Sequence, residues 1–211
     1  MYNWSMKCNL RVYLVLAFVT AAHLAACVSG DSAPQKHASA QPVLTGSAHV
    51  YDGDSIFMGR VEVRLDAIDA PERDQACLGA NGKFWPCGIV SRDALRAMVG
   101  ERDVRCVISG RDKYRRLLGI CTAGARDLGA AMVASGNAIA YHYFSERYAS
   151  QESHARSQHI GIWQDAHFTE PYFCRHFSSG HTCYEYDYAA GTGRVASLPL
   201  IGKSHAVGAP D

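Results

Sequence analysis

The segment 49–68, which we predict as strand, constrains the fold most, because its residues 61–66 alternate between apolar and charged side chains. Val61, Val63 and Leu65 are apolar, and the residues between them are charged. Successive side chains of a strand point to opposite faces, so this alternation predicts a strand with one buried and one solvated face. Pro71 ends the strand, because proline removes a backbone donor.

Helices and short strands follow this segment. Pro86 suits the start of a helix and Asp127 suits a helix N-cap. The predicted elements are a helix over 86–99, a hairpin with strands at 104–108 and 116–122, a helix over 127–136 and a helix over 145–158. Strands come first, helices enter late, and no strand–helix–strand rhythm repeats. This order predicts an α+β fold with a small antiparallel barrel and about three helices.

The chain starts with the pattern of a secretory leader. Lys7 and Arg11 precede an apolar run at 12–22, which is short of the ~20 residues of a transmembrane helix. The run leads into Leu-Ala-Ala-Cys, where two interpretations remain. Cys27 is lipidated as in bacterial lipoproteins and attaches the protein to a membrane, or an ordinary leader is cut near Ala26. Both interpretations predict export, to the periplasm or cell envelope as a lipoprotein and otherwise as a secreted protein.

Composition divides the chain further. The predicted parts are a leader (1–27), a flexible linker (28–45), a folded domain (46–165), a disulfide-stapled extension (166–183) and a disordered tail (184–211). The formal charge is +1, and without the two basic leader residues 19 basic residues face 20 acidic ones. This balance excludes a protein that coats nucleic acid through bulk positive charge. Any anion must be recognised by a few locally placed side chains.

Six cysteines follow the leader region, and an even number in an exported chain predicts disulfides. Six cysteines allow 15 connectivities, which spacing alone does not resolve. We predict the pairs of sequence neighbours, which are Cys77 with Cys87, Cys106 with Cys121 and Cys174 with Cys183. For the last pair zinc is an alternative, because His176 and His181 lie close by.

Two acidic motifs carry candidate chemistry. Asp52 and Asp54 flank a glycine and offer hard oxygen ligands for Ca²⁺ or Mg²⁺, although an Asp-Gly turn alone explains such a motif. In the second motif Arg64 lies on the solvated strand face, and Asp69 and Glu72 lie at the strand end. An arginine can grip phosphate, and carboxylates can hold a metal or activate water. A surface salt bridge is the plainer interpretation.

Two further groups suit a nucleotide. The segment 111–116 holds four cations and Tyr114, which suit phosphate oxygens and a stacked base, whereas a solvated turn is the alternative. Tyr141 belongs to a late aromatic group that either packs in the core or forms a stacking wall. The other members of this group are His142, Tyr143, Phe144 and Tyr148.

Taken together, these motifs resemble the staphylococcal nuclease (thermonuclease) family. The matching motifs are Tyr-Asp-Gly-Asp-Ser at 51–55, Arg-Leu-Asp-Ala-Ile-Asp-Ala-Pro-Glu at 64–72, Asp-Lys-Tyr-Arg-Arg at 112–116, Ala-Arg at 155–156 and Gly-Ile-Trp at 161–163. Their order and spacing are similar to those of the family over residues 46–165. The resemblance implies an OB-type barrel of five strands with three helices.

The resemblance also implies a site and a reaction. Calcium, or another divalent cation, would be held by Asp54, Asp69 and the backbone carbonyl of Ala70. Glu72 would act as general base on water. The remaining matched positions are the catalytic arginines Arg64 and Arg116 and the nucleotide-pocket residues Lys113 and Tyr114.

These residues predict hydrolysis of phosphodiester bonds in DNA or RNA, with little sequence preference, by a monomer. Arg115 stands where the family has glycine, so either Arg115 or Arg116 could face the phosphate. The alternative function is a catalytically silent module of the same fold that binds nucleic acid or protein. Retention of the metal aspartates, the glutamate and both arginines favours the enzyme.

Overall fold

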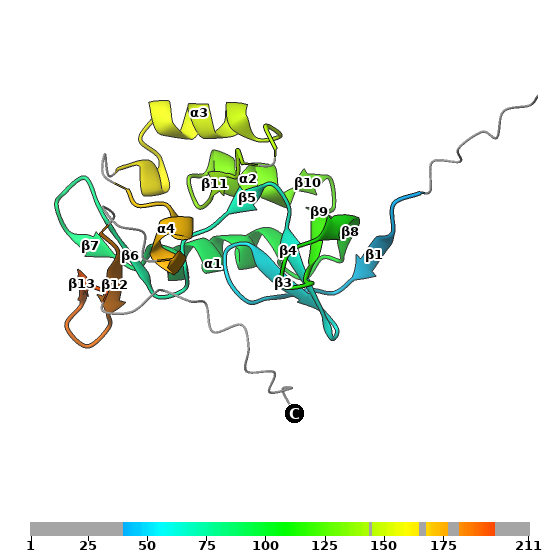
Figure 1. Cartoon of the computed structure of the whole chain (residues 1–211), viewed down its shortest axis with the longest axis horizontal. Helices are drawn as coiled ribbons and strands as arrows, with labels where there is room; N and C mark the ends of the chain where they lie inside the picture. Colours follow the sequence, from blue (N-terminus) through cyan, green and yellow to red (C-terminus); the bar gives the residue numbers. More distant parts are fainter. Residues whose placement is uncertain (1–39, 144, 165–167, 177–181, 197–211) are drawn as a thin grey trace, which may run out of the picture. The chain divides into compact units, whose positions relative to one another are not determined.

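The computed structural model describes residues 40–143, 145–164, 168–176 and 182–196. In chain order (Figure 1), the elements are β1 (Val43–Gly46), β2 (His49–Val50), β3 (Ser55–Met58), β4 (Val61–Leu65), β5 (Ile68–Asp69), β6 (Gln75–Leu78), β7 (Phe84–Trp85), α1 (Cys87–Val99), β8 (Val104–Arg111), β9 (Leu117–Ala123), β10 (Arg126–Asp127), α2 (Leu128–Ala134), β11 (Ile139–Ala140), α3 (Ala149–Ser157), the 3₁₀ helix η1 (Gly161–Gln164), α4 (Pro171–His176), β12 (Tyr184–Asp187) and β13 (Thr192–Val195). Within these ranges no helix is long and apolar enough to cross a membrane. The predicted leader, Cys27 and Phe144 lie outside the described residues.

The largest sheet has seven strands in the order β1-β8-β9-β4-β3-β2, with β10 beside β9. Strands β4 and β9 pair in parallel, with Val63 opposite Leu117. This pair corrects the prediction of a purely antiparallel sheet. The chain between the two strands holds α1 and β8, and a crossover of this length can bring a strand back in the same direction. Two smaller sheets pair β11 with β5 and join β13-β12-β6-β7.

Strand β4 confirms the predicted alternation along most of its length. Val63 and Leu65 are buried, and Glu62 and Arg64 between them are partly exposed. Val61 differs, because at the start of the strand its side chain is 40% exposed. Its neighbours Gly59 and Arg60 form the turn that joins β3 to β4, so little of the core reaches this end of the strand.

The main core lies between the seven-stranded sheet and helices α1 and α2. It includes Val63, Leu65, Leu95, Leu128 and Met132, which are at most 2% exposed. Helix α1 follows Pro86, as predicted. At the start of α2, the side chain of Asp127 accepts a hydrogen bond from the Ala130 amide at 3.0 Å, so Asp127 is the predicted cap. Helix α3 begins later than predicted, at Ala149.

The C-terminal region contains a fourth helix, α4, and a β-hairpin that the sequence analysis did not predict. Strands β12 and β13 form this hairpin, and β12 pairs with β6 through Tyr184 opposite Ala76 (Figure 1). Residues 184–196 therefore do not belong to a disordered tail, whereas 197–211 lie outside the described residues. Gly193 lets the hairpin approach β7, since a Cβ there would lie 2.5 Å from the ring of Phe84. We refer to the described residues 168–176 and 182–196 together as the C-terminal extension.

The three predicted disulfides are confirmed. Cys77–Cys87 joins β6 to α1, Cys106–Cys121 crosses from β8 to β9, and Cys174–Cys183 joins α4 to the residue before β12. The last bond excludes the zinc alternative for this pair, because both thiols are consumed in the disulfide. The linker predicted to end at residue 45 overlaps β1, because residues 43–46 pair with β8.

Candidate active site

Asp54 and Asp69 meet at the side chain of Arg64. Asp54 precedes β3, Arg64 lies on β4 and Asp69 ends β5. One nitrogen, Nη2 of Arg64, lies 2.6 Å from Asp54 Oδ2 and 2.5 Å from Asp69 Oδ1. Asp54 is 3% exposed and Asp69 is fully buried. One carboxylate oxygen from each aspartate therefore contacts the same guanidinium group inside the protein.

The backbone around Asp54 fixes the position of its carboxylate. The amide of Ala70 donates to Asp54 Oδ2 at 3.1 Å, and Ser55 Oγ donates to Asp54 Oδ1 at 3.0 Å. The preceding residue must be glycine, because a Cβ on Gly53 would lie 2.0 Å from Ser91 Oγ. This close packing against α1 holds the acidic turn over the end of β5.

Asp52 and Asp54 differ in their electrostatics. Burial raises the pKa of Asp52 well above its ordinary range, and the carboxylate of Asp54 adds to this effect. Burial also acts to raise the pKa of Asp54, but Arg64 and then Arg175 outweigh it and hold that pKa below its ordinary range. Of the two, Asp54 is thus the residue whose negatively charged form its surroundings favour.

Glu72 lies in the loop after β5 and is 9% exposed. Its amide donates to Gln75 Oε1 at 3.1 Å. Its carbonyl faces the start of α1, where a Cβ on Gly88 would lie 1.8 Å away. Burial raises the pKa of the Glu72 carboxyl to about 7, although Arg175 acts to lower it. A carboxyl group with a pKa near the working pH suits general acid–base catalysis.

Arg175 is a residue of this cluster that the sequence analysis missed. Its Nη1 donates to Glu72 Oε1, and its Nη2 donates to Asp69 Oδ2 at 2.8 Å. The side chain is 20% exposed and belongs to α4. A helix of six residues is too short to reveal itself by apolar periodicity. The nearest signal in the sequence is the adjacent Cys174, whose disulfide with Cys183 joins the two described parts of the C-terminal extension but does not indicate a role for Arg175.

Arg116 lies on the same sheet face as Arg64, at a different level. The parallel register that pairs Val63 with Leu117 places Arg116 beside Glu62, and their side chains are 3.6 Å apart. Along a strand, Glu62 and Arg64 are separated by about 7 Å. Arg116 Nε also donates to Asp112 Oδ2 at 2.7 Å. Arg116 is therefore held next to the cluster but is paired with other carboxylates.

The rest of the 112–116 turn is exposed. Arg115 has a φ of +71°, the left-handed conformation that usually favours glycine, and its side chain is exposed. Two cations lie near the ring of Tyr114. Lys113 Nζ is 5.1 Å from the ring centroid, and Arg116 Cζ is 5.5 Å from it. Of the neighbouring Arg115 and Arg116, only Arg116 is partly buried and lies on the same sheet face as Arg64.

The late aromatic residues divide into core and surface. Tyr148 is buried, and its hydroxyl donates to Asp127 Oδ1 at 2.9 Å, so it packs as the core alternative predicted. Tyr143 is 82% exposed. Tyr141 follows β11 and is partly buried. Its burial and, to a smaller extent, the negative charge of the nearby Asp69 raise the pKa of its hydroxyl. Tyr141 is thus the member of the group that adjoins the acidic cluster.

The chemistry of Asp54 and Asp69 fits a divalent cation. Both offer hard carboxylate oxygens, and both already contact one positive centre, Arg64. Within the described ranges, no group of three or more His, Cys, Asp or Glu side chains is arranged to hold a metal. Ca²⁺ takes 6–8 oxygens, so backbone, water or substrate oxygens would have to complete its coordination.

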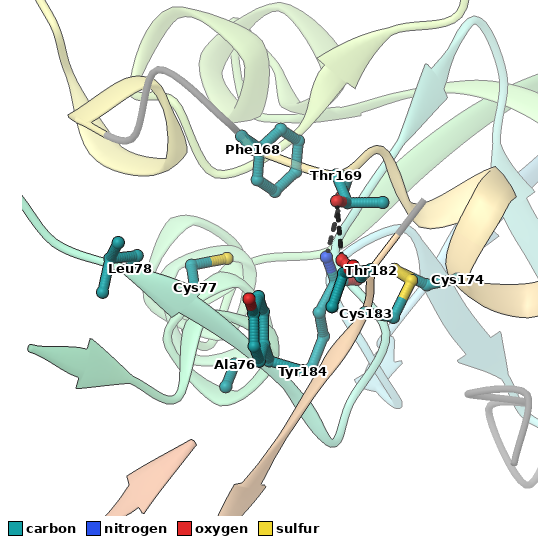
Figure 2. A pocket seen from close by; sticks show the side chains of 10 residues that line it. Ala76, Cys77, Leu78, Phe168, Thr169, Cys174, Thr182, Cys183 and Tyr184 are labelled. Carbon is teal, nitrogen blue, oxygen red and sulfur yellow. Dashed lines mark hydrogen bonds between the residues drawn. A yellow bond between two sulfur atoms is a disulfide. The ribbon is translucent and has the colours of Figure 1, made fainter. Parts of the chain in front are cut away.

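The pocket in Figure 2 lies elsewhere. It has a volume of about 20 Å³ and is lined by β6, Thr169 and the Cys174–Cys183 disulfide rather than by the carboxylates. A volume of this order holds about one water molecule. At the carboxylate cluster itself, the guanidinium groups of Arg64 and Arg175 lie between the acidic side chains.

Comparison with known proteins gives concordant results. The family model "Staphylococcal nuclease homologue" matches residues 62–165. A succinoglycan biosynthesis protein of Rhizobium meliloti is 38% identical over 129 residues, which cover 60% of this chain and 67% of that protein. The micrococcal nuclease of Shigella flexneri is 31% identical over 150 residues, covering 63% and 80%, and an uncharacterized endonuclease of Haemophilus influenzae is 30% identical over 129 residues, covering 58% and 67%. The chain therefore belongs to the family of staphylococcal nuclease homologues.

Proposed function

We propose that this protein is an exported, calcium-dependent nuclease that hydrolyses phosphodiester bonds in DNA or RNA with little sequence specificity. The observation that carries the proposal is the convergence of Asp54 and Asp69 on Arg64, with Glu72 linked to the same group through Arg175. Two relatives that are named as nucleases, from Shigella flexneri and Haemophilus influenzae, support it.

The carboxylates of Asp54 and Asp69, together with the Ala70 carbonyl, would hold the cation. A divalent cation, for which Ca²⁺ is our first candidate, would polarise a phosphate oxygen and make bound water more acidic. Glu72 would accept the proton of the attacking water at its carboxylate, and it lies in the loop that follows Asp69 at the end of β5. A pKa of about 7 supports this role.

The arginines would stabilise the negative charge that develops on the phosphate oxygens. Arg64 on β4 and Arg116, the residue before β9, lie on the same face of the sheet, so both can address one phosphodiester group. A preorganised donor of this kind typically contributes ~10²–10³ in rate. The residues proposed to border the nucleotide are Lys113, Tyr114, Arg115 and Tyr141.

The barrel is also a proposal. Strands β1 and β2 are separated by two residues, Ser47 and Ala48, and β1 pairs with β8 whereas β2 pairs with β3. We propose that β1 and β2 act as one bent strand that closes a five-stranded OB-type barrel with β3, β4, β9 and β8. Such barrels commonly bind oligonucleotides on one face, which agrees with the position of Arg64.

Other features of the protein remain proposals as well. We expect a monomer with its folded domain near 46–165, preceded by a cleaved leader and a linker. The three disulfides support an oxidising compartment. If Cys27 is lipidated, the membrane is a second partner beside the nucleic acid.

The test is cleavage of single- and double-stranded DNA and RNA by residues 28–211 with intact disulfides, in Ca²⁺ and then in chelator. We expect Ca²⁺-dependent cleavage that falls by about 10²–10³ in Glu72→Gln and in Arg64→Ala. Glu101→Gln is the matched control, because Glu101 is exposed after α1. A folded parent that cuts neither substrate with Ca²⁺, Mg²⁺ or Mn²⁺ would leave a binding module as the function.

A further inference from the structure

Arg175 joins the candidate active site from outside the segment that matches the family model. The match ends at residue 165, and Arg175 lies on α4 in the C-terminal extension. Its guanidinium bridges two carboxylates with different proposed roles, one being the metal ligand Asp69 and the other the base Glu72. The extension thus adds a positively charged side chain to the proposed reaction centre.

The extension holds Arg175 in place through several contacts. The preceding residue, Cys174, is fully buried and bonded to Cys183. Close to this disulfide, Thr169 Oγ1 donates to the carbonyl of Thr182 at 2.8 Å (Figure 2). Strand β12 begins next and pairs with β6. A six-residue helix would be unstable alone, so these contacts position it.

The extension is also tied directly to the loop that carries Glu72. Gln75 Nε2 donates to the Thr169 carbonyl at 3.0 Å, and Gln75 Oε1 accepts from the Glu72 amide. Gln75 is only 2% exposed. Because one buried side chain bonds both segments, the loop and the extension keep a fixed relative position. Arg175 is therefore a preorganised guanidinium.

The charges at the site indicate what this guanidinium can bind. Asp54, Asp69 and Glu72 face two arginines, so the five groups formally carry one negative charge. A divalent cation would change this sum to one positive charge, which matches a phosphodiester anion. Both oxygens of Asp69 already accept from guanidinium groups, Oδ1 from Arg64 and Oδ2 from Arg175. A cation that binds Oδ2 of Asp69 would compete with Arg175 for that oxygen.

We propose that Arg175 is a phosphate-binding residue of this site, supplied by the C-terminal extension. The proposal rests on the proposed nuclease function. Arg175 is largely buried and has two carboxylate partners, so weakening of its pair with Asp69 favours a replacement anion, and a phosphate oxygen beside Glu72 is such an anion. The planar fork of arginine can contact Glu72 and one phosphate oxygen together. Arg116, in contrast, is paired with Asp112 and Glu62.

The alternative role for Arg175 is that of a structural counter-ion that never contacts substrate. The two roles differ in the binding of a phosphate. We choose thymidine 5′-monophosphate as the probe, because it carries a phosphate and no phosphodiester bond to cut. Its dissociation constant is measured by calorimetry at saturating Ca²⁺, and Ca²⁺ affinity is measured separately without nucleotide. Steady-state kinetics on single-stranded DNA complete the set.

The variants are Arg175→Gln and Arg175→Lys in residues 28–211. The matched control is Arg194→Gln, which removes an exposed arginine that pairs with Glu185 in the same extension. We expect Arg175→Gln to weaken nucleotide binding by about tenfold, the loss of one charge-assisted hydrogen bond, while Ca²⁺ affinity stays equal or rises. Arg175→Lys should recover part of the loss, since lysine keeps the charge without the fork. The control should match the parent.

Unchanged nucleotide affinity in Arg175→Gln, with Ca²⁺ still bound, would overturn the proposal and leave Arg175 as a counter-ion. If Arg175→Gln does not fold, Arg175→Lys decides, and parental nucleotide affinity in that variant contradicts the proposal. A parent that binds the nucleotide through Arg175 but does not cut DNA contradicts the proposed nuclease alone. The two proposals therefore fail in different measurements.

Discussion

The seven-stranded sheet and the C-terminal extension position charged side chains in different ways. In the sheet, Arg64 projects from β4 between buried neighbours, and Val63 and Leu65 anchor the strand in the main core. In the extension, Arg175 projects from a six-residue helix whose own buried cluster consists of Cys174, Cys183 and Ala196. Packing of apolar side chains fixes the first arginine. The second depends on a disulfide, since so small a cluster buries little apolar area.

This difference shows how a charged group can be added to an existing site. A new strand in the main sheet would have to alter its register and its core. Helix α4 is linked by a disulfide to the residue before β12, and β12 pairs with the edge of strand β6. Such an addition needs only one free strand edge. Covalent and edge contacts can thus bring a distant residue to a buried carboxylate pair.

The largest effect should come from Arg64→Met, which keeps the side-chain length and removes the charge. Two buried carboxylates, Asp54 and Asp69, then lose a shared partner. Breaking a buried ion pair in this way costs about 3–5 kcal/mol. The free energy of unfolding in chelator, measured with urea, should fall by that order, and Ca²⁺ should restore part of it. Arg105→Met, at an exposed position of β8, is the control. Equal stability of Arg64→Met and parent would show that the aspartates are protonated or hydrated.

Two of the three disulfides, Cys106–Cys121 and Cys174–Cys183, should respond differently to double Cys→Ser substitution. Loss of Cys106–Cys121, whose cysteines have a sequence separation of 15, should lower the free energy of global unfolding by about 3 kcal/mol. Loss of Cys174–Cys183 should change global unfolding little but should release Arg175. Hydrogen exchange would then rise at β12 and α4 while the main sheet stays protected. Parallel losses of protection in both regions would contradict a separately supported extension.

The sequence predicted the sheet-borne part of the site because its residues occupy regular patterns. Alternation along β4 assigned Arg64 to the solvated face, and the Asp-Gly-Asp and Pro-Glu motifs marked the two ends that the fold brings together. These signals are local in sequence. That Asp54 and Asp69 share one site is not local information, and it followed only from the resemblance to a known family; their meeting at a nitrogen of Arg64 was not predicted.

The sequence did not predict Arg175, because its position depends on long-range contacts. Its partner Glu72 is 103 residues away along the chain, and a six-residue helix carries no periodic signal. For the β12–β13 hairpin a signal was present and was missed. Tyr184, Tyr186 and Tyr188 alternate with acidic residues, a period of two that outweighs the Gly- and Ala-rich composition of the tail. Composition alone is a weak guide to disorder in such a segment.

Gly193→Ala tests how tightly the hairpin packs on β7. A Cβ at this position would lie 2.5 Å from Phe84, so the ring or the strand must move. Overpacking of this kind costs about 1–3 kcal/mol. We expect faster hydrogen exchange in β12 and β13 with a small change in global unfolding. Gly191→Ala is no matched control, because its φ is +66°; Ala190→Gly in the same turn serves instead. Parental exchange in Gly193→Ala would show that Phe84 yields freely.

The smallest effect concerns His142, at the surface of the main domain. Its ring nitrogens contact Glu152 at 2.6 Å and Glu146 at 3.0 Å, and the hydrogen bond to Glu152 is the main cause that raises the pKa of His142. The protonated ring is thus favoured in the folded state, so its contribution is full below the unfolded pKa of about 6.5 and is lost as pH rises through the higher folded value. Arg156 faces Glu152 at 3.7 Å and competes for the same carboxylate.

His142→Gln should therefore destabilise the protein most near pH 5.5 and least above pH 8. Because the side chain is 43% exposed, solvent screening limits the difference to about 0.5 kcal/mol. The measurement is the free energy of unfolding of parent and variant at intervals from pH 5 to pH 9, with the exposed His154→Gln on α3 as control. A difference that is constant across this range would mean that the ring acts as a neutral hydrogen-bonding group. In that case Glu152 is held by the Ala140 amide, which donates to it at 3.2 Å, and by Arg156.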